Sequence, residues 1–303
     1  MEVQTVYNVG SEAPLGLPIA TYFFMTGLSA GSFVMSAVAT VGGIKRFKPI
    51  ARIGAILAPV LLMLAPIFLI IDLTQPLRFW HLFVYLNPTS PITYGSFLLT
   101  VYPISGLIYA YFLFSDNTRM AKVFGVLGMP LAIATHGYTG FILALSKRPL
   151  WSTALMPTLF IVSAMLSGVA LLIFIVTIRL WIFRRNRPKP EREETAALVM
   201  ELGRLMGWLI AADLFLVAND ILVLLTSRTE ELYVAHMMLA GEFAPLFLGV
   251  EIGLGCLLPL VLVFAPRTRR STVVTMLSSL LVLVGVYTMR VVVVFAGQSV
   301  PLH

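Results

Sequence analysis

Residues 51–91 read ARIGAILAPVLLMLAPIFLIIDLTQPLRFWHLFVYLNPTSP. The first part, Ala51–Leu73, is almost entirely apolar, and about 20 such residues in a helix cross the ~30 Å hydrocarbon core of a bilayer. The second part, Asp72–Pro91, carries a carboxylate, an arginine, a histidine, several aromatic residues and prolines. The stretch therefore predicts a transmembrane helix that is followed by a rigid, polar and aromatic loop.

Long apolar runs recur along the whole chain of 303 residues, which is 59% hydrophobic and 12% charged. A soluble domain carries about 25% charged residues, and a soluble fold would need every one of these helices to be buried on all sides. The composition predicts an all-α polytopic membrane protein with eight transmembrane helices. The expected spans are Pro18–Ile44, Ala51–Leu73, Ile92–Phe114, Met120–Ser146, Ser152–Ile182, Gly203–Leu225, Leu239–Ala265 and Ser271–Ala296.

The basic residues predict the orientation. Sixteen of them fall in one set of loops and four in the other, and cytoplasmic loops carry the excess of lysine and arginine. Both termini are then expected outside a prokaryotic inner membrane. The net charge of +7 is explained by this topology signal and does not indicate nucleic acid. The smaller set is Arg78, Lys147, Arg148 and Arg228.

The charged stretch RRNRPKPEREET divides the chain. We expect an outer N-terminal tail (1–17), a first set of spans with the candidate site plus span five (18–183), a solvated cytoplasmic linker (184–202), and spans six to eight with an outer C-terminus (203–303).

Four polar residues fall at a similar depth near the outer face: Tyr22, Asp72, His136 and Tyr138. Ionisable groups inside a membrane are costly, and they usually indicate function. Each residue also has an ordinary explanation. The tyrosines are typical of membrane interfaces, Asp72 can cap loop amides or pair with Arg78, and His136 can bond to a neighbouring carbonyl. Their common depth favours a shared pocket.

Spans six to eight carry a second polar set. Asp213 and Asp220 share a helix face, Glu242 and Glu251 are expected on span seven, and Arg290 is expected on span eight. Buried carboxylates without partners take up protons. The set predicts either a stepwise proton relay or an ion-pair network that holds these spans together.

Fixed cofactors are disfavoured. The chain has four histidines, and only His136 lies well inside a span, so the paired ligands of a membrane dihaem are missing. The single cysteine cannot ligate an iron–sulfur cluster, and no metal-ligand spacing occurs. A lipid-soluble quinone fits the remaining chemistry, because a phenol and an imidazole can bind its oxygens and a carboxylate can accept its protons.

The segment DLTQPLRFWHLFVYLNPTSPITYGSF resembles the D-L-G-x-P-x-R-F … N-P-T-S-P-x-x-W-G segment of the NrfD/PsrC family of polysulfide-reductase-type membrane subunits. GLSAG, YTGFILA, PLWSTALMPTLFIVSAMLSG, FLGVEIGLGCLLPL and RVVVVFAGQSVPL resemble further family motifs in the same order, over nearly the full chain.

The resemblance implies two four-helix bundles, a menaquinol or ubiquinol site near the outer face, a partner with [4Fe-4S] clusters and a molybdopterin catalytic subunit. The family tyrosine that contacts the quinone falls on Tyr138, and a histidine used by one branch falls on Tyr22. Asp72 is the candidate proton acceptor, with His136 beside it. The exposed loop is the expected docking platform, through Arg78, His81 and Asn87.

The function expected from the residues and the resemblance together is a membrane subunit that oxidises or reduces a quinol and exchanges electrons with an iron–sulfur subunit. A proton- or ion-coupled transporter and a purely structural anchor are the alternatives. No haem and no metal are expected in this chain.

Overall fold

The computed structural model describes residues 15–43, 45–73, 75–146, 148–183, 188–227 and 229–299, and in these ranges the regular structure is helical. Within these ranges, eight helices are long and apolar enough to cross a membrane, so the prediction of an eight-span helical protein is confirmed. They are α1 (Leu17–Val41), α2 (Lys48–Asp72), α4 (Pro91–Phe114), α5 (Thr118–Ala144), α6 (Met156–Ile182), α7 (Lys189–Thr226), the continuous pair η3 (Pro245–Leu257) and α9 (Leu258–Phe264), and α10 (Thr272–Gln298).

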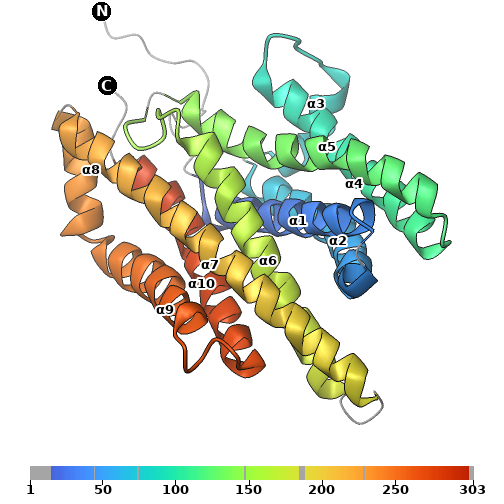
Figure 1. The fold of residues 1–303 in the computed structure, drawn as a ribbon. Coiled ribbons are helices and arrows are strands. Elements are labelled where there is room, and N and C mark those ends of the chain that lie inside the picture. The colour runs from blue at the N-terminus through green and yellow to red at the C-terminus, as the bar shows by residue number, and fades with distance from the viewer. Residues whose placement is uncertain are drawn as a thin grey trace, which may run out of the picture.

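Short elements join the spans (Figure 1). Between α2 and α4, the loop quoted above folds into η2 (Pro76–Arg78) and the single turn α3 (His81–Val84), which project from the end of the bundle. The element η1 (Lys45–Phe47) precedes α2, and α8 (Thr229–Leu239) precedes η3. The remaining connections are short, as expected for neighbouring antiparallel helices.

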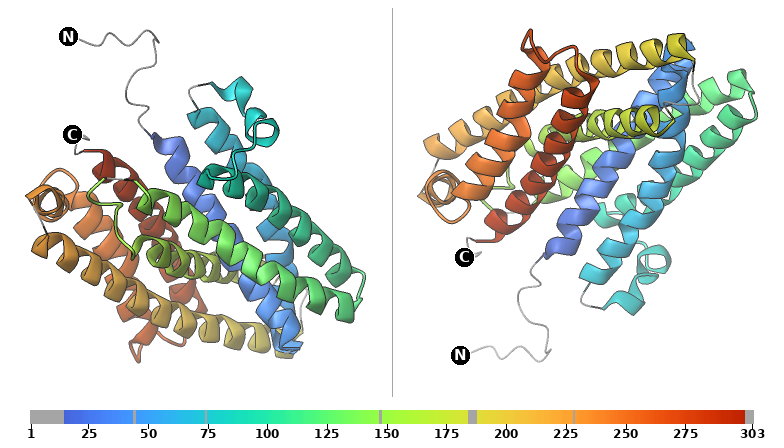
Figure 2. Two further views of the ribbon diagram at one scale, coloured as in Figure 1. Left: turned by 90° about the horizontal axis from the view of Figure 1, so that it is seen from above. Right: turned by 90° about the horizontal axis from the view of Figure 1, so that it is seen from below.

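Helix α1 lies at the centre of the packing and contacts α2, α5, α6 and α10 (Figure 2). It crosses α6 closely, because Gly31 on α1 packs directly on Ala164 and Gly168 of α6. Small residues let helix backbones approach in a membrane, where dispersion contacts replace the hydrophobic effect as the driving force. Helix α10 packs on α1, α6, α7 and η3. Both α1 and α10 thus join the two sets of spans, and the division into two four-helix bundles stays a prediction.

The described chain begins and ends at the same end of the molecule. The Leu15 N–H donates to Oε1 of Gln298 (2.6 Å), and Nε2 of Gln298 donates to the Leu15 carbonyl (3.0 Å). An even number of spans requires this arrangement. Residues 1–14 of the expected tail lie outside the described residues.

The expected linker 184–202 differs from the structure. Residues 184–187 lie outside the described residues, but Lys189–Leu202 forms the first part of α7, which is 38 residues long. At ~1.5 Å per residue this helix is nearly twice as long as the bilayer core is thick. The sequence after Pro190 is rich in glutamate, alanine and leucine, which favour helix, and Leu198, Val199 and Leu202 are buried. The polar composition of residues 189–202 therefore does not prevent them from being helical.

The expected start of span seven also differs. Leu239 ends α8, a turn follows, and the span begins at Pro245. Glu242 is exposed in that turn, so its expected place on span seven is wrong. The apolar residues that suggested an earlier start belong to α8, and three of them, Val234, Ala235 and Met238, are buried against the rest of the protein.

Candidate functional site

A buried polar cluster lies where α1, α5, α6 and α10 meet. His136 of α5 is only 1% exposed. Its Nε2 lies 3.3 Å from Nη2 of Arg290 on α10, and its Nδ1 lies 3.2 Å from Oγ1 of Thr26 on α1. A guanidinium can only donate, so Nε2 accepts and the ring proton of a neutral imidazole is on Nδ1. The Thr26 hydroxyl accepts a hydrogen bond from the Nδ1–H group and donates one to the carbonyl of Phe23 (3.0 Å).

Arg290 is held from α6. It is 1% exposed, its Nη2 donates to Oγ of Ser163 (2.5 Å), and its guanidinium carbon lies 3.8 Å from the centre of the Phe160 ring. The same ring stacks on His136 at 5.6 Å between centroids. A cation is attracted to the face of an aromatic ring, most strongly when water is excluded. Phe160 and Ser163 thus fix the position of Arg290 against His136.

Two carboxylates of the second set also lie near Arg290. Asp213 of α7 and Glu251 of η3 are buried, and both interact electrostatically with Arg290 and with each other. In the described part of the chain, Oδ1 of Asp213, Oε2 of Glu251, and Nε and Nη1 of Arg290 are buried without a hydrogen-bond partner. Buried polar atoms in native proteins normally have a hydrogen-bond partner in the protein or in ordered water. These atoms therefore suit a site that holds water.

A small cavity lies between Asp220 and Glu251. It has a volume of about 30 Å³ and is lined by Asp220, Glu251 and otherwise apolar side chains, among them Met289 and Phe247. This is enough room for one or two water molecules. Asp220 and Glu251 belong to different helices, so the cavity links α7 to η3.

The backbone around Glu251 is unusual. Residues Pro245–Leu257 form a π-helix, and Glu251 lies at its centre. Such helices are rare and occur frequently at functional sites. Gly255 of this segment packs directly on the backbone of Gly285 of α10, which brings η3 close to the helix that carries Arg290.

The two tyrosines predicted for the site lie together. Tyr22 of α1 is buried, Tyr138 of α5 is half-buried, and they are close enough to interact electrostatically. The Tyr138 ring lies against the backbone of Gly95 on α4, where a Cβ would overlap it. The exposed edge of Tyr138 is the part of this pair that a ligand can reach.

Asp72 occupies a different position. Its Oδ1 accepts a hydrogen bond from the N–H of Gly16 (3.1 Å), which is the N-cap residue of α1. Among the described residues, no hydrogen bond or ion pair joins Asp72 to His136, to Tyr138 or to Arg78. Asp72 thus makes the capping contact that the sequence left open as an alternative. The structure brings Tyr22 close to Tyr138, and it brings His136 into contact with Arg290.

The expected docking loop exposes a large apolar surface. Leu77 is 88% exposed, and Trp80, Phe83 and Tyr85 are also exposed. Arg78 is exposed beside them. His81 packs edge-on against Trp80 and Tyr85, with ring centroids 4.1 and 5.2 Å away.

Asn87 is engaged within the loop. Its side-chain oxygen accepts hydrogen bonds from the N–H (3.1 Å) and the hydroxyl (2.7 Å) of Thr89. It therefore stabilises the turn before α4.

Three residues of the cluster were missed by sequence reasoning: Thr26, Phe160 and Ser163. Hydroxyls and phenylalanines are common in membrane helices, so their types carry no signal. Spacing along one helix also cannot reveal them, because the cluster is assembled from four helices.

Comparison with known proteins assigns the family. The model of the family described as "Polysulphide reductase, NrfD" matches residues 5–301. A polysulfide reductase polypeptide of Wolinella succinogenes is 28% identical over 93% of both sequences. A selenate reductase polypeptide of Mesobacillus selenatarsenatis is 27% identical over 94% of this chain and 74% of its own length. The Hdr-like menaquinol oxidoreductase integral membrane subunit of Archaeoglobus fulgidus is 26% identical over 97% of this chain and 73% of its own length.

These matches extend over all eight spans and confirm the resemblance carried by the sequence motifs. The chain is a multi-pass membrane protein, and it belongs to the polysulphide reductase, NrfD family.

Proposed function

We propose that this chain is the membrane subunit of a respiratory oxidoreductase complex, where it oxidises a quinol and delivers the electrons to an iron–sulfur partner. The names of its relatives support membership of such a complex, and one of them is named a menaquinol oxidoreductase subunit. The observation that carries the proposal is the fully enclosed His136, fixed by Arg290 and Thr26 two residues before the half-buried Tyr138.

The residues present fit a quinone headgroup by their chemistry. The Tyr138 hydroxyl can donate to a carbonyl oxygen from a position that is open at one edge, and the buried Tyr22 stands behind it. Bound quinol supplies two electrons and two protons on oxidation. Because this chain has a single cysteine, we expect the electrons to leave for clusters on a partner that docks on the exposed loop around Trp80.

The side chains of this chain handle the protons. Asp72 lies at the outer end of α2 and is only partly buried, so its free oxygen can accept a proton and release it to water. His136 has a positioning role, because its Nδ1 already carries the ring proton and its Nε2 lone pair accepts a hydrogen bond from Arg290. Arg290 fixes the tautomer of His136 and interacts electrostatically with Asp213 and Glu251. The cavity between Asp220 and Glu251 then offers a path for protons into the second set of spans.

The test uses the intact complex. We expect Tyr138→Phe to lower the amount of quinone that co-purifies and the rate of quinol oxidation, because one hydrogen bond to the headgroup is lost. His136→Gln should lower the rate. Tyr111→Phe is the matched control, since Tyr111 is 67% exposed on α4 and has no part in the proposed site. Quinone content is measured by extraction and chromatography, and the rate with a soluble quinol analogue.

The alternatives predict other results. A purely structural anchor predicts unchanged quinone content and rate in both variants. An ion- or proton-coupled transporter predicts solute uptake by vesicles that contain the isolated subunit.

A further inference from the structure

Three arginines line a groove between α7 and the turn that joins α9 to α10, at the end of the bundle where most basic residues gather. The volume of this arginine groove is about 470 Å³. Arg204 comes from α7, and Arg269 and Arg270 come from the turn. The other lining residues are apolar: Met200, Val263 and Phe264. No step of the proposed function uses this groove.

The charge of the arginine groove has one sign. None of its lining residues in the described chain is acidic, and the three arginine side chains make no hydrogen bond or ion pair with any other described residue. The nearest acid along α7, Glu201, pairs with Arg46 and does not line the groove. The glutamates at the start of α7 end at Glu194, which is ten residues, or ~15 Å, from Arg204 along the helix.

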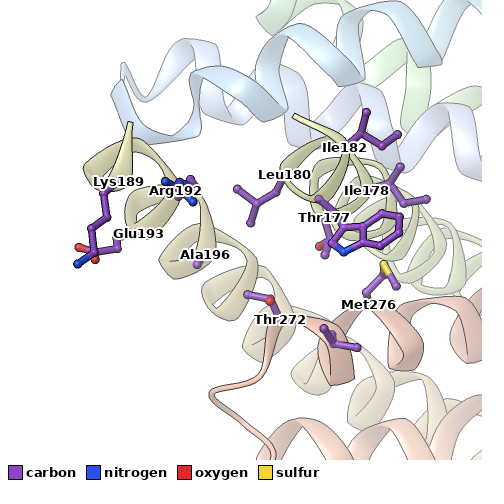
Figure 3. Close-up of a pocket in the computed structure, with 12 residues that line it drawn as sticks. Thr177, Ile178, Leu180, Ile182, Lys189, Arg192, Glu193, Ala196, Thr272 and Met276 are labelled. Carbon is purple, nitrogen blue, oxygen red and sulfur yellow. The ribbon is translucent and has the colours of Figure 1, made fainter. Parts of the chain in front are cut away.

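A larger groove shows the contrast. It has a volume of about 820 Å³ and lies between the end of α6 and the beginnings of α7 and α10 (Figure 3). Its charged lining residues are of both signs: Lys189, Arg192 and Glu193. Exposed apolar walls occur in both grooves and are ordinary in a membrane-spanning chain. The unbalanced positive charge is therefore what distinguishes the arginine groove.

Contacts of the turn keep the arginines together. The N–H of Arg269 donates to the carbonyl of Ala265 (3.0 Å) within the turn. The ring of Phe264, just before the turn, lies against α7 at Gly207, where an added Cβ would be 2.6 Å from Cε2 of the ring. The turn is thus held close to Arg204. Like charges at one groove repel one another, and a bound anion would offset that repulsion.

We infer that the arginine groove binds the phosphate of an anionic phospholipid in the leaflet at the basic end. The phosphate lies among Arg204, Arg269 and Arg270, and one acyl chain lies along Phe264 and Trp208. A guanidinium can donate two parallel hydrogen bonds to one phosphate. Basic pockets between membrane helices bind acidic headgroups in this way.

The position of the groove favours a lipid over a soluble anion. Trp208 lies one turn after Arg204 on the same face of α7, toward the middle of the span. It is 69% exposed, and its ring centroid lies 5.7 Å from that of Phe264. A lipid whose phosphate meets the arginines therefore has its acyl chain at this aromatic pair.

Trp208 provides a direct probe. The intact complex is reconstituted in nanodiscs of phosphatidylcholine with an increasing share of brominated phosphatidylglycerol, and in a parallel series with brominated phosphatidylcholine. Bromine on an acyl chain quenches tryptophan fluorescence at contact. The difference between wild type and Trp208→Phe isolates the signal of this residue from the other tryptophans of the complex.

We expect brominated phosphatidylglycerol to quench Trp208 at a several-fold lower mole fraction than brominated phosphatidylcholine. Arg269→Gln with Arg270→Gln should abolish most of that preference, since each basic residue near an anionic lipid is worth about a fivefold change in binding. Lys189→Gln with Arg192→Gln is the matched control. It removes two positive charges at the same end of the protein but outside the arginine groove, so the preference should persist.

Equal quenching by the two lipids in the wild type would overturn the inference, as would a preference that survives the Arg269 and Arg270 substitutions. An equal loss of preference in the control would also overturn it, because the effect would then come from the general charge of the surface. Absence of quenching by both lipids would mean that protein covers the groove, which contradicts the inference too. These readouts do not depend on quinol oxidation, so the inference stands or falls separately from the proposed function.

Discussion

The crossing of α1 and α6 allows one substitution to be worked out from the structure. A Cβ added at Gly31 would overlap the carbonyl oxygen of Ala164 and lie 2.9 Å from Cα of Gly168, whereas ordinary contact begins at 3.4 Å. The opposing atoms belong to the backbone of a helix and cannot rotate away. Because the overlap with the carbonyl oxygen is the more severe of the two, Gly31→Ala forces the helices apart by about one ångström, and a gap of that size forfeits roughly half of each dispersion contact across the crossing.

The expected cost lies at the upper end of the range for overpacking, about 3 kcal/mol. For chains of comparable size, each kcal/mol lowers the midpoint of thermal unfolding by about 2–4 °C, so we expect a decrease on the order of 10 °C. Because α1 also carries Tyr22 and Thr26, the displacement should lower the rate of quinol oxidation as well. The assay is thermal unfolding of the detergent-solubilised complex, followed by intrinsic fluorescence.

Gly249→Ala is the matched control, because a Cβ added at Gly249 meets nothing within 4 Å. It should leave the unfolding midpoint unchanged. A Gly31→Ala complex as stable and as active as the wild type would refute the reasoning, since it would mean that the two backbones are not in contact.

Three further predictions concern the proposed site. Gly27→Ala places a Cβ 3.1 Å from Cε1 of His136, so we expect slower quinol oxidation with a smaller loss of thermal stability than at Gly31, and an unchanged rate would contradict the assigned role of the imidazole. Glu251→Gln should lower proton translocation in reconstituted vesicles while quinol oxidation continues, whereas an unaltered ratio of protons to electrons would mean that the buried carboxylates are structural. Asp72→Asn keeps an oxygen for the N–H of Gly16 but cannot take up a proton, so the rate should fall at constant unfolding midpoint, and wild-type turnover would reduce Asp72 to a helix cap.

The membrane class, the eight spans and the family could all be predicted from the amino-acid sequence alone. Hydrophobic length is a local property, and a helix is the structure that satisfies the backbone polar groups of a single segment in lipid. The loop from Asp72 to Pro91 was recognisable for a similar reason, because its residue types are out of place in an apolar chain.

Which polar groups meet depends on the packing of the helices. The sequence placed His136 with Asp72 by depth along the helices, but depth says nothing about rotation, and the rotation of α5 turns the imidazole toward Arg290 and Thr26 while Asp72 caps α1. The length of α7, 38 residues, and the π-helix around Glu251 were also hidden, because a polar composition does not show where a helix ends. Side chains from four helices form one cluster through packing, and packing is a property of the whole chain.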